Sequence, residues 1–361
     1  MSSSPRNGSW TYGEYLQLPE LLNLQAEERG ISNDELHFII VHQTFELWFK
    51  QIICELSLVR DILTQEKVLE SDIPKACDHL GRTSEIFRLM ANQWGVLETL
   101  TPQGFLAFRD GLGSASGFES YQVREFELLL GLKQEDRLYK MDVIEQFRKL
   151  AKNSEYDAAI LARLEAIQAK PSLFDSLLKW IERTPIMGSS YGDEGDELVV
   201  SDYVDSHLTG HRSVCDSAIA RLGDQGADHA EAAVARFDAA QIAAENFLRP
   251  DGEVNRARAG LLFIESYREL PLLTWPRKMI DTMVELEELI VKWRHSHARM
   301  VERIMGKRMG TGGSSGVDYL DDTAKYRIFK DLWAVRTILI KPQQRPELLN
   351  GDFYNFNVEN N

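Results

Sequence analysis

The segment ISNDELHFIIVHQTFELWFKQIICELSL, residues 31–58, decides the fold because it has the pattern of one long helix. Ser32 followed by Glu35 forms a capping box, a pair typical of a helix start. A mostly apolar stripe then recurs every three or four residues, as one face of a helix requires; it comprises Phe38, His42, Phe45, Phe49, Ile53 and Leu56. A second stripe comprises Leu36, Ile40, Leu47 and Cys54. Because a helix that is apolar on two faces lies between neighbours, we expect this one to be buried.

The same helical periodicity continues along most of the chain. We expect a second helix at about 73–100 and a short one that begins at Thr101 and Pro102, an N-cap followed by a proline in the first turn. A long helix is expected at about 276–309 and a last helical stretch at about 319–339. No segment alternates convincingly like a strand, and there is no internal repeat. The predicted fold is therefore all-α, a bundle of long helices.

The chain divides into an arm, one large domain and a tail. Residues 1–10 are polar and are expected to form a flexible arm. Residues 11–340 are expected to form a single helical domain, and residues 341–361 a frayed tail. Within the domain, residues 134–244 are rich in Asp, Glu and Ala and have the character of an acidic helical insertion. That segment contains few residues suited to chemistry.

Composition excludes several classes of partner. Of 361 residues, 43% are hydrophobic and 27% charged, as in a globular protein with a sizeable core. The formal net charge of −15 repels phosphate backbones and anionic membranes, so neither is an expected partner. No apolar run approaches the roughly 20 residues that a membrane span needs. The start of the chain lacks an apolar signal core, and its three cysteines have the spacing of buried free thiols. We therefore expect a cytoplasmic protein.

The histidines are the main candidates for chemistry, because glycine-rich nucleotide motifs, H-E-x-x-H and paired Glu-x-x-His are all absent. Five of the eight have mostly polar neighbours and are expected at the surface; they are His37, His79, His207, His211 and His229. His207 and His211 are four residues apart and could share a metal, but no third ligand is near them in the sequence.

His42 and His297 differ from the others. His42 lies on the apolar stripe, where a buried imidazole needs a hydrogen-bond partner or a ligand. His295 and His297 are two residues apart, about 200° around a helix, so at most one of them points inward. Haem needs only one axial imidazole and leaves the opposite face of the iron open for oxygen. Spacing alone leaves open both a haem site and ordinary core histidines.

Arg109 follows Phe105 and Phe108 on the short apolar helix, beside the glycine-rich segment 111–117. A desolvated guanidinium needs an anion, which could be an internal carboxylate or the carboxylate of an amino-acid substrate. The segment GTGGSSG, residues 310–316, is either a linker or a loop that orders over a bound substrate.

Six motifs in this order and spacing resemble tryptophan 2,3-dioxygenases. The resemblance covers about residues 12–339 and is weak over 134–244. The motifs are TYGEYL (11–16), FIIVHQTFELWFK (38–50), WGVLETLTP with FRD (94–110), SGF (116–118), WRHSH (293–297) and GTGGSSG (310–316). The chain departs from the family pattern at Phe105, where some members carry Tyr, and at Glu119 and His295.

The resemblance implies an all-helical, usually tetrameric enzyme that holds haem b. It implies that His297 is the axial ligand of the iron, with Trp94 beside the haem. It further implies that His42 faces the indole N–H of the substrate. The remaining substrate residues that it implies are Phe38, Phe105, Arg109, Ser116 and Thr311. Tyr12, Tyr15 and Leu16 match a motif that a neighbouring subunit inserts into the pocket.

The reaction that the resemblance implies is insertion of both atoms of O2 across the indole C2–C3 bond of L-tryptophan, giving N-formylkynurenine. Some relatives instead place one oxygen atom on a substituted tryptophan such as β-methyltryptophan, giving a 2-oxindole. That alternative needs a reductant, and the motifs do not exclude it. A haem sensor without turnover and a helical scaffold without a cofactor are further alternatives. Arg109 argues against a sensor, because a sensor needs no amino-acid clamp.

Overall fold

The computed structural model describes residues 9–113, 117–223, 227–309 and 316–356. These residues form helices and connecting loops, and their only β structure is an isolated bridge between Ile186 and Ser189. The predicted all-α fold is therefore confirmed.

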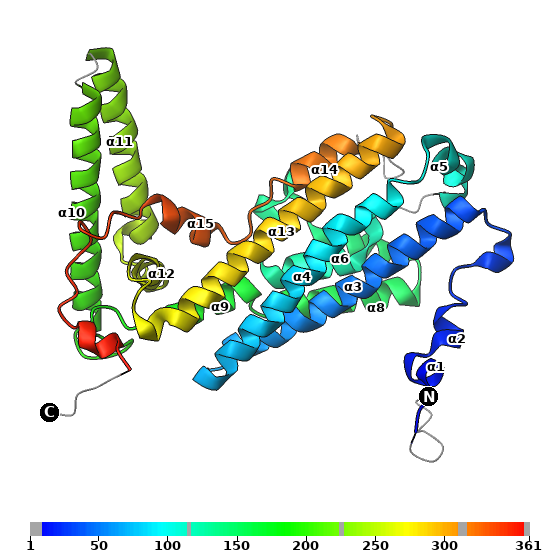
Figure 1. The fold of residues 1–361 in the computed structure, drawn as a ribbon, viewed down its shortest axis with the longest axis horizontal. Helices are drawn as coiled ribbons and strands as arrows, with labels where there is room; N and C mark the ends of the chain where they lie inside the picture. Colours follow the sequence, from blue (N-terminus) through cyan, green and yellow to red (C-terminus); the bar gives the residue numbers. More distant parts are fainter. Residues whose placement is uncertain (1–8, 114–116, 224–226, 310–315, 357–361) are drawn as a thin grey trace.

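Three long helices form the centre of the fold: α3 (Asn33–Leu63), α4 (Ile73–Leu97) and α13 (Thr274–Met305). They lie side by side, with α4 packed against both of the others (Figure 1). α4 and α13 run in the same direction, and α3 runs in the opposite one. Shorter helices surround this centre: α6 (Tyr121–Leu130), α7 (Val143–Leu150), α8 (Glu155–Gln168), α9 (Leu173–Ile181) and α14 (Val317–Thr323).

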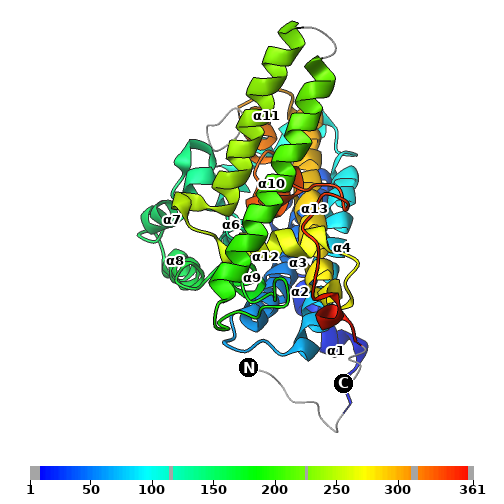
Figure 2. The same ribbon diagram turned by 90° about the vertical axis from the view of Figure 1, so that its left-hand side faces the viewer.

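A pair of helices projects from the bundle. α10 (Asp196–Gly223) and α11 (Ala227–Leu248) pack along each other and extend beyond the remaining helices (Figures 1 and 2). α12 (Arg256–Ser266) and α15 (Lys330–Thr337) connect this pair to the bundle. The predicted acidic segment 134–244 thus comprises α7 to α9, which pack against the bundle, and most of the projecting pair.

Both predicted N-caps form, but Glu35 does not complete the capping box at the start of α3. The Ser32 hydroxyl accepts the Glu35 backbone N–H at 3.1 Å, and the Thr101 hydroxyl accepts that of Gly104 at 3.0 Å. The last predicted helical stretch, however, divides into α14 and α15. Between them the chain turns so that the buried Glu287 carboxylate of α13 accepts the backbone N–H groups of residues 328 and 329.

The two stripes of α3 differ in how far they are buried. Phe45 and Phe49 of the first stripe are buried, but Ile40 and Leu47 of the second are 44% and 51% exposed, and Cys54 is also exposed. The expectation that both faces are buried is therefore wrong for a single chain. α4, α5, α6 and α9 all pack against α3 and leave these three residues of the second stripe exposed.

Two other expectations also fail. His207 and His211, expected at the surface, are 0% and 7% exposed. They do not share a metal, because His207 Nε2 lies 3.0 Å from the Ile338 carbonyl oxygen and His211 Nδ1 lies 2.6 Å from the amide oxygen of Gln241. The tail is not wholly frayed, since Tyr354 is 1% exposed and its hydroxyl donates to the Pro185 carbonyl oxygen at 3.0 Å.

A buried carboxylate joins α6 to α13. Glu127 accepts hydrogen bonds from Arg124, Arg137 and Arg294, and all four side chains are less than a tenth exposed. Burial alone would raise the pKa of Glu127, but the three guanidiniums lower it to about 2. Arg294 also donates to the Thr323 carbonyl oxygen at 2.8 Å, so the last residue of α14 is bonded to the same ion network.

Glu127→Gln should destabilise the protein by about 3–5 kcal/mol, because it leaves buried guanidiniums without their anion. Urea unfolding measures this difference. The control is Glu145→Gln, whose carboxylate pairs with Arg148 in an exposed position and should contribute at most about 1 kcal/mol.

The same carboxylate predicts the acid limb of stability. The pKa of Glu127 is lowered in the folded protein, so its contribution is complete above its ordinary value of 4.5 and disappears as pH falls toward about 2. Unfolding free energies measured across this window should fall less steeply in Glu127→Gln than in the wild type. Equal slopes would contradict the assignment.

Candidate functional site

Six of the predicted site residues lie toward one end of the bundle, where α3 begins and α4 and α13 end (Figure 1). The short helix α5 (Pro102–Arg109) lies at this end and contacts both α3 and α13. They come from four helices: Phe38 and His42 from α3, Trp94 from α4, Phe105 and Arg109 from α5, and His297 from α13.

His297 lies against an aromatic surface. Its ring is stacked on the Trp94 indole with centroids 4.4 Å apart and planes 2° from parallel, and the Trp293 ring is 6.3 Å away. No group in the described part of the chain hydrogen bonds to this imidazole. Although some of the residue is accessible, loss of hydration, together with a smaller effect of the nearby His42, lowers the pKa of His297 to about 3. The ring is therefore neutral at physiological pH and has a nitrogen lone pair to offer.

His42 is held by its own helix. Its Nδ1 lies 2.8 Å from the Phe38 carbonyl oxygen, one turn earlier in α3. Because a carbonyl oxygen can only accept, Nδ1 carries the proton and Nε2 keeps its lone pair. Burial lowers the pKa of His42, and the bond to Phe38 and the charge of Glu46 oppose this only in part. His42 thus presents a neutral, basic nitrogen.

Aromatic rings of α3 and α5 meet beside His42. The Phe38 ring lies 4.0 Å from the His42 ring, 5.9 Å from Phe105 and 5.6 Å from Phe108. Phe105 and Phe108 are 6% and 7% exposed. Sequence reasoning placed Phe38 and Phe105 in the site but assigned no role there to Phe108. The three-residue spacing of Phe105 and Phe108 is the signal that both rings lie on one face.

Arg109 is the cation of the site. Its guanidinium donates to the Met309 carbonyl oxygen at 2.5 Å. No carboxylate of the described residues pairs with it, so the internal salt bridge considered from the sequence is not found there. A guanidinium has five N–H donors, and a single backbone contact leaves most of them available for an anion.

The remaining predicted residues do not join this cluster. Ser116 and Thr311 lie outside the described residues. Tyr12, Tyr15 and Leu16 lie on α1 (Tyr12–Leu16), where they are 77%, 73% and 41% exposed. α1 and α2 (Leu18–Leu21) extend away from the bundle (Figure 1). One chain by itself therefore does not bring the N-terminal motif to its own site.

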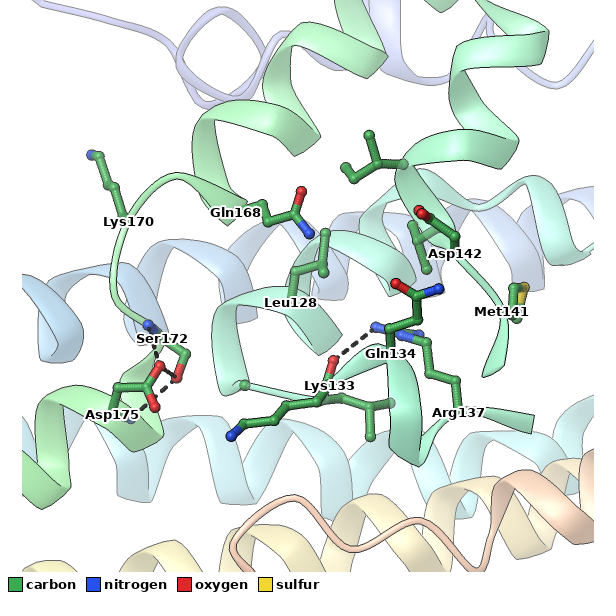
Figure 3. Close-up of a pocket in the computed structure, with 14 residues that line it drawn as sticks. Leu128, Lys133, Gln134, Arg137, Met141, Asp142, Gln168, Lys170, Ser172 and Asp175 are labelled. Atoms are coloured by element: carbon green, nitrogen blue, oxygen red, sulfur yellow. Dashed lines mark hydrogen bonds between the residues drawn. The ribbon is translucent and has the colours of Figure 1, made fainter. Parts of the chain in front are cut away.

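Figure 3 shows a different cavity, of about 170 Å³, whose lining includes no residue of α3, α4, α5 or α13. The Arg137 guanidinium at its wall is bound by Glu127. Ser172 and Asp175, also at its wall, bond to each other as the capping box of α9. Because these polar groups satisfy one another, we do not regard this cavity as the candidate site.

The described residues contain neither a cluster suited to a bare metal ion nor a membrane-spanning helix. No group of three or more His, Cys, Asp and Glu side chains could hold a bare metal ion there. None of the helices in those parts of the chain is long and apolar enough to cross a membrane.

Comparisons with known proteins agree with the sequence resemblance. A family model described as tryptophan 2,3-dioxygenase matches residues 2–339. A tryptophan 2,3-dioxygenase from Sorangium cellulosum is 40% identical over 96% of this chain and 88% of its own length. One from Ralstonia nicotianae, tryptophan 2,3-dioxygenase 2, is 40% identical over 97% of this chain and 98% of its own. One from the mosquito Anopheles gambiae is 34% identical over 94% and 88%.

The hydrogen bonds of two neighbouring histidines predict opposite tautomers. NMR of protein labelled at histidine should show His42 protonated at Nδ1 at neutral pH. The internal control is His37, whose Nε2 lies 3.2 Å from the Val96 carbonyl oxygen and should therefore carry the proton. A proton on Nε2 of His42 would contradict the hydrogen bond from its Nδ1 to the Phe38 carbonyl oxygen.

Proposed function

The chain belongs to the tryptophan 2,3-dioxygenase family and is an oxidoreductase, and we propose that it uses haem b to insert O2 into the indole C2–C3 bond of L-tryptophan, giving N-formylkynurenine. The observation that carries this proposal is the pair of neutral histidines at one end of the bundle. His297 has an uncommitted imidazole among aromatic rings, and His42 has an unprotonated Nε2 beside Phe38 and Phe105.

The residues present fit haem. His297 is kept neutral, and no hydrogen bond in the described part of the chain occupies the ring nitrogen that an axial ligand must offer. The buried indole N–H of Trp94 has no acceptor among the described residues, and a buried donor of this kind costs about 1–3 kcal/mol. An acidic cofactor supplies acceptors of the missing type. When bound through His297, haem iron would supply the binding and activation of O2.

Arg109 and the aromatic rings would hold the substrate. A carboxylate fits the fork of the Arg109 guanidinium, with charge-assisted bonds of roughly 1.5–3 kcal/mol each. Thr311 is proposed to contact the ammonium group and Ser116 to lie beside the haem. Phe38 and Phe105 would enclose the indole ring, whose apolar surface contributes about 25 cal/mol per Å² when buried.

His42 would orient the indole. Its Nε2 accepts and cannot donate while Nδ1 is bonded to Phe38, so it suits the indole N–H. With both ends of the substrate held and water excluded, the electron-rich C2–C3 bond is presented to oxygen. Both oxygen atoms enter the product as the C2–C3 bond breaks, so the reaction consumes no external electrons.

The site would be completed by a second subunit. We propose a homotetramer in which Tyr12, Tyr15 and Leu16 of one chain reach the pocket of a neighbour. Their large exposed fractions support this, since these side chains remain available for contact with a second chain. The exposed stripe of α3, with Ile40 and Leu47, is a second apolar surface available for assembly. We further propose that the enzyme acts in the cytoplasm, in accord with its free cysteines.

Turnover of L-tryptophan under ¹⁸O₂ tests the function. The purified enzyme should show the Soret band of haem and form N-formylkynurenine that carries two labelled oxygen atoms. A 2-oxindole with one labelled atom, formed only with a reductant, would replace the proposal with the monooxygenase alternative. A Soret band without turnover would indicate a sensor, and no Soret band after haem supplementation would indicate a scaffold.

Arg109→Ala should raise the KM for tryptophan about 10- to 150-fold, the equivalent of one lost charge-assisted interaction. The inhibition constant of 3-methylindole should be the same in Arg109→Ala and in the wild type, because this compound has no carboxylate to bind. The control is Arg303→Ala, which removes a guanidinium paired with Glu98 at the exposed end of α13. Unchanged kinetics in Arg109→Ala would remove this residue from the site.

A further inference from the structure

Contacts other than the one with His297 hold the Trp94 side chain in place. Its side chain is 3% exposed and lies near the end of α4. The Phe45 ring of α3 is 4.2 Å away, and the Trp293 ring of α13 is 6.3 Å away at 26°. Three helices therefore fix the plane of this indole, and that plane is the surface on which the imidazole lies.

A histidine that binds a metal usually donates its second ring N–H to a carboxylate or a carbonyl, which sets the rotation of the ring. No such partner of His297 exists among the described residues. Two buried carboxylates beside this helix, Glu127 bound to Arg294 of α13 and Glu287 of α13 itself, are committed elsewhere. Glu127 is bound by three guanidiniums, and Glu287 accepts from Trp333 and from two backbone N–H groups. Another interaction must hold the ring.

We propose that Trp94 is a positioning residue that sets the rotation of the His297 imidazole by face-to-face stacking, in place of the usual hydrogen bond. The inference rests on the proposed role of His297 as the axial ligand of haem. With the planes 2° from parallel, rotation of the imidazole out of this orientation would drive its edge into the indole. An aromatic pair contributes about 0.5–1.5 kcal/mol beyond the area it buries, enough to favour one orientation by up to about tenfold.

Unlike a hydrogen bond, the stack leaves both ring nitrogens of His297 free. Both ring nitrogens of His297 lie in the plane parallel to the indole, so the contact uses neither of them. One can bind iron while the contact with Trp94 remains unchanged. Trp94 would in this way orient the ligand without adding charge to it.

The test compares Trp94→Leu and Trp94→Phe in the haem-loaded enzyme. Resonance Raman spectra of the ferrous protein report the iron–histidine stretching band, and transfer of haem to apomyoglobin reports its release. Trp94→Leu should broaden or shift the band and release haem up to about tenfold faster, whereas Trp94→Phe, which keeps a flat face, should remain close to the wild type. A band and a release rate unchanged in Trp94→Leu would overturn the proposal.

Two controls separate orientation from general damage. Phe87→Leu removes a fully buried ring that contacts Trp293 but not His297, so it should lower stability and leave the iron–histidine band in place. An equal change in that variant would overturn the proposal. His297→Gly should lose the band, and added imidazole should restore haem binding. If His297→Gly keeps the wild-type band, the ligand assignment itself fails, whatever the Trp94 variants show.

If Trp94→Leu does not fold, the comparison of Trp94→Phe with Trp94→Tyr and Trp94→His still decides the question. All three keep a flat ring, so stacking predicts a band as narrow as that of the wild type. A broadened band in all three would overturn the proposal.

Discussion

The site depends on keeping a neutral imidazole in a fixed place inside an interior built largely of aromatic rings. A charged histidine could not remain there, because burial removes the hydration that a cation needs. Desolvation accordingly lowers the pKa of His297 to about 3. A neutral ring has few strong polar contacts to hold it, so its position must come from the packing of the helix that carries it and of the rings around it.

The helices meet that requirement by separating polar anchoring from the aromatic contact. Arg294 lies three residues before His297 on α13 and is bound to Glu127 of α6 and to the end of α14. The ion network therefore fixes this turn of α13 without placing a charge on the imidazole. On the aromatic side of the same helix, Trp293 packs against Trp94 of α4. Strong electrostatic restraint of Arg294 and an aromatic environment for His297 thus coexist within one helical turn.

His42 is held by a hydrogen bond within its own helix. His42 obtains its hydrogen bond from the backbone of its own helix, so its tautomer does not depend on a distant partner. Phe38 supplies both that carbonyl and an aromatic ring of the pocket. Arg109, by contrast, reaches across to the Met309 carbonyl oxygen, and its contact depends on how α5 sits against the end of α13. The orientation of His42 is thus determined within one helix, whereas that of Arg109 depends on the contact between two segments of the chain.

The sequence by itself determined the all-α class, the starts of α3 and α5, the placement of both site histidines on helices, and the family. These follow from local rules, since periodicity, caps and ordered motifs are written in neighbouring residues. Only the tertiary structure decided what covers each face. The second stripe of α3, with Ile40 and Leu47, has the same pattern as a buried one and is exposed, while His207 has polar neighbours and is buried. The stacking of Trp94 on His297 and the committed state of Glu127 join residues far apart in the chain. Periodicity shows which side of a helix is apolar, but contact between helices depends on their relative position and rotation, which no local pattern specifies.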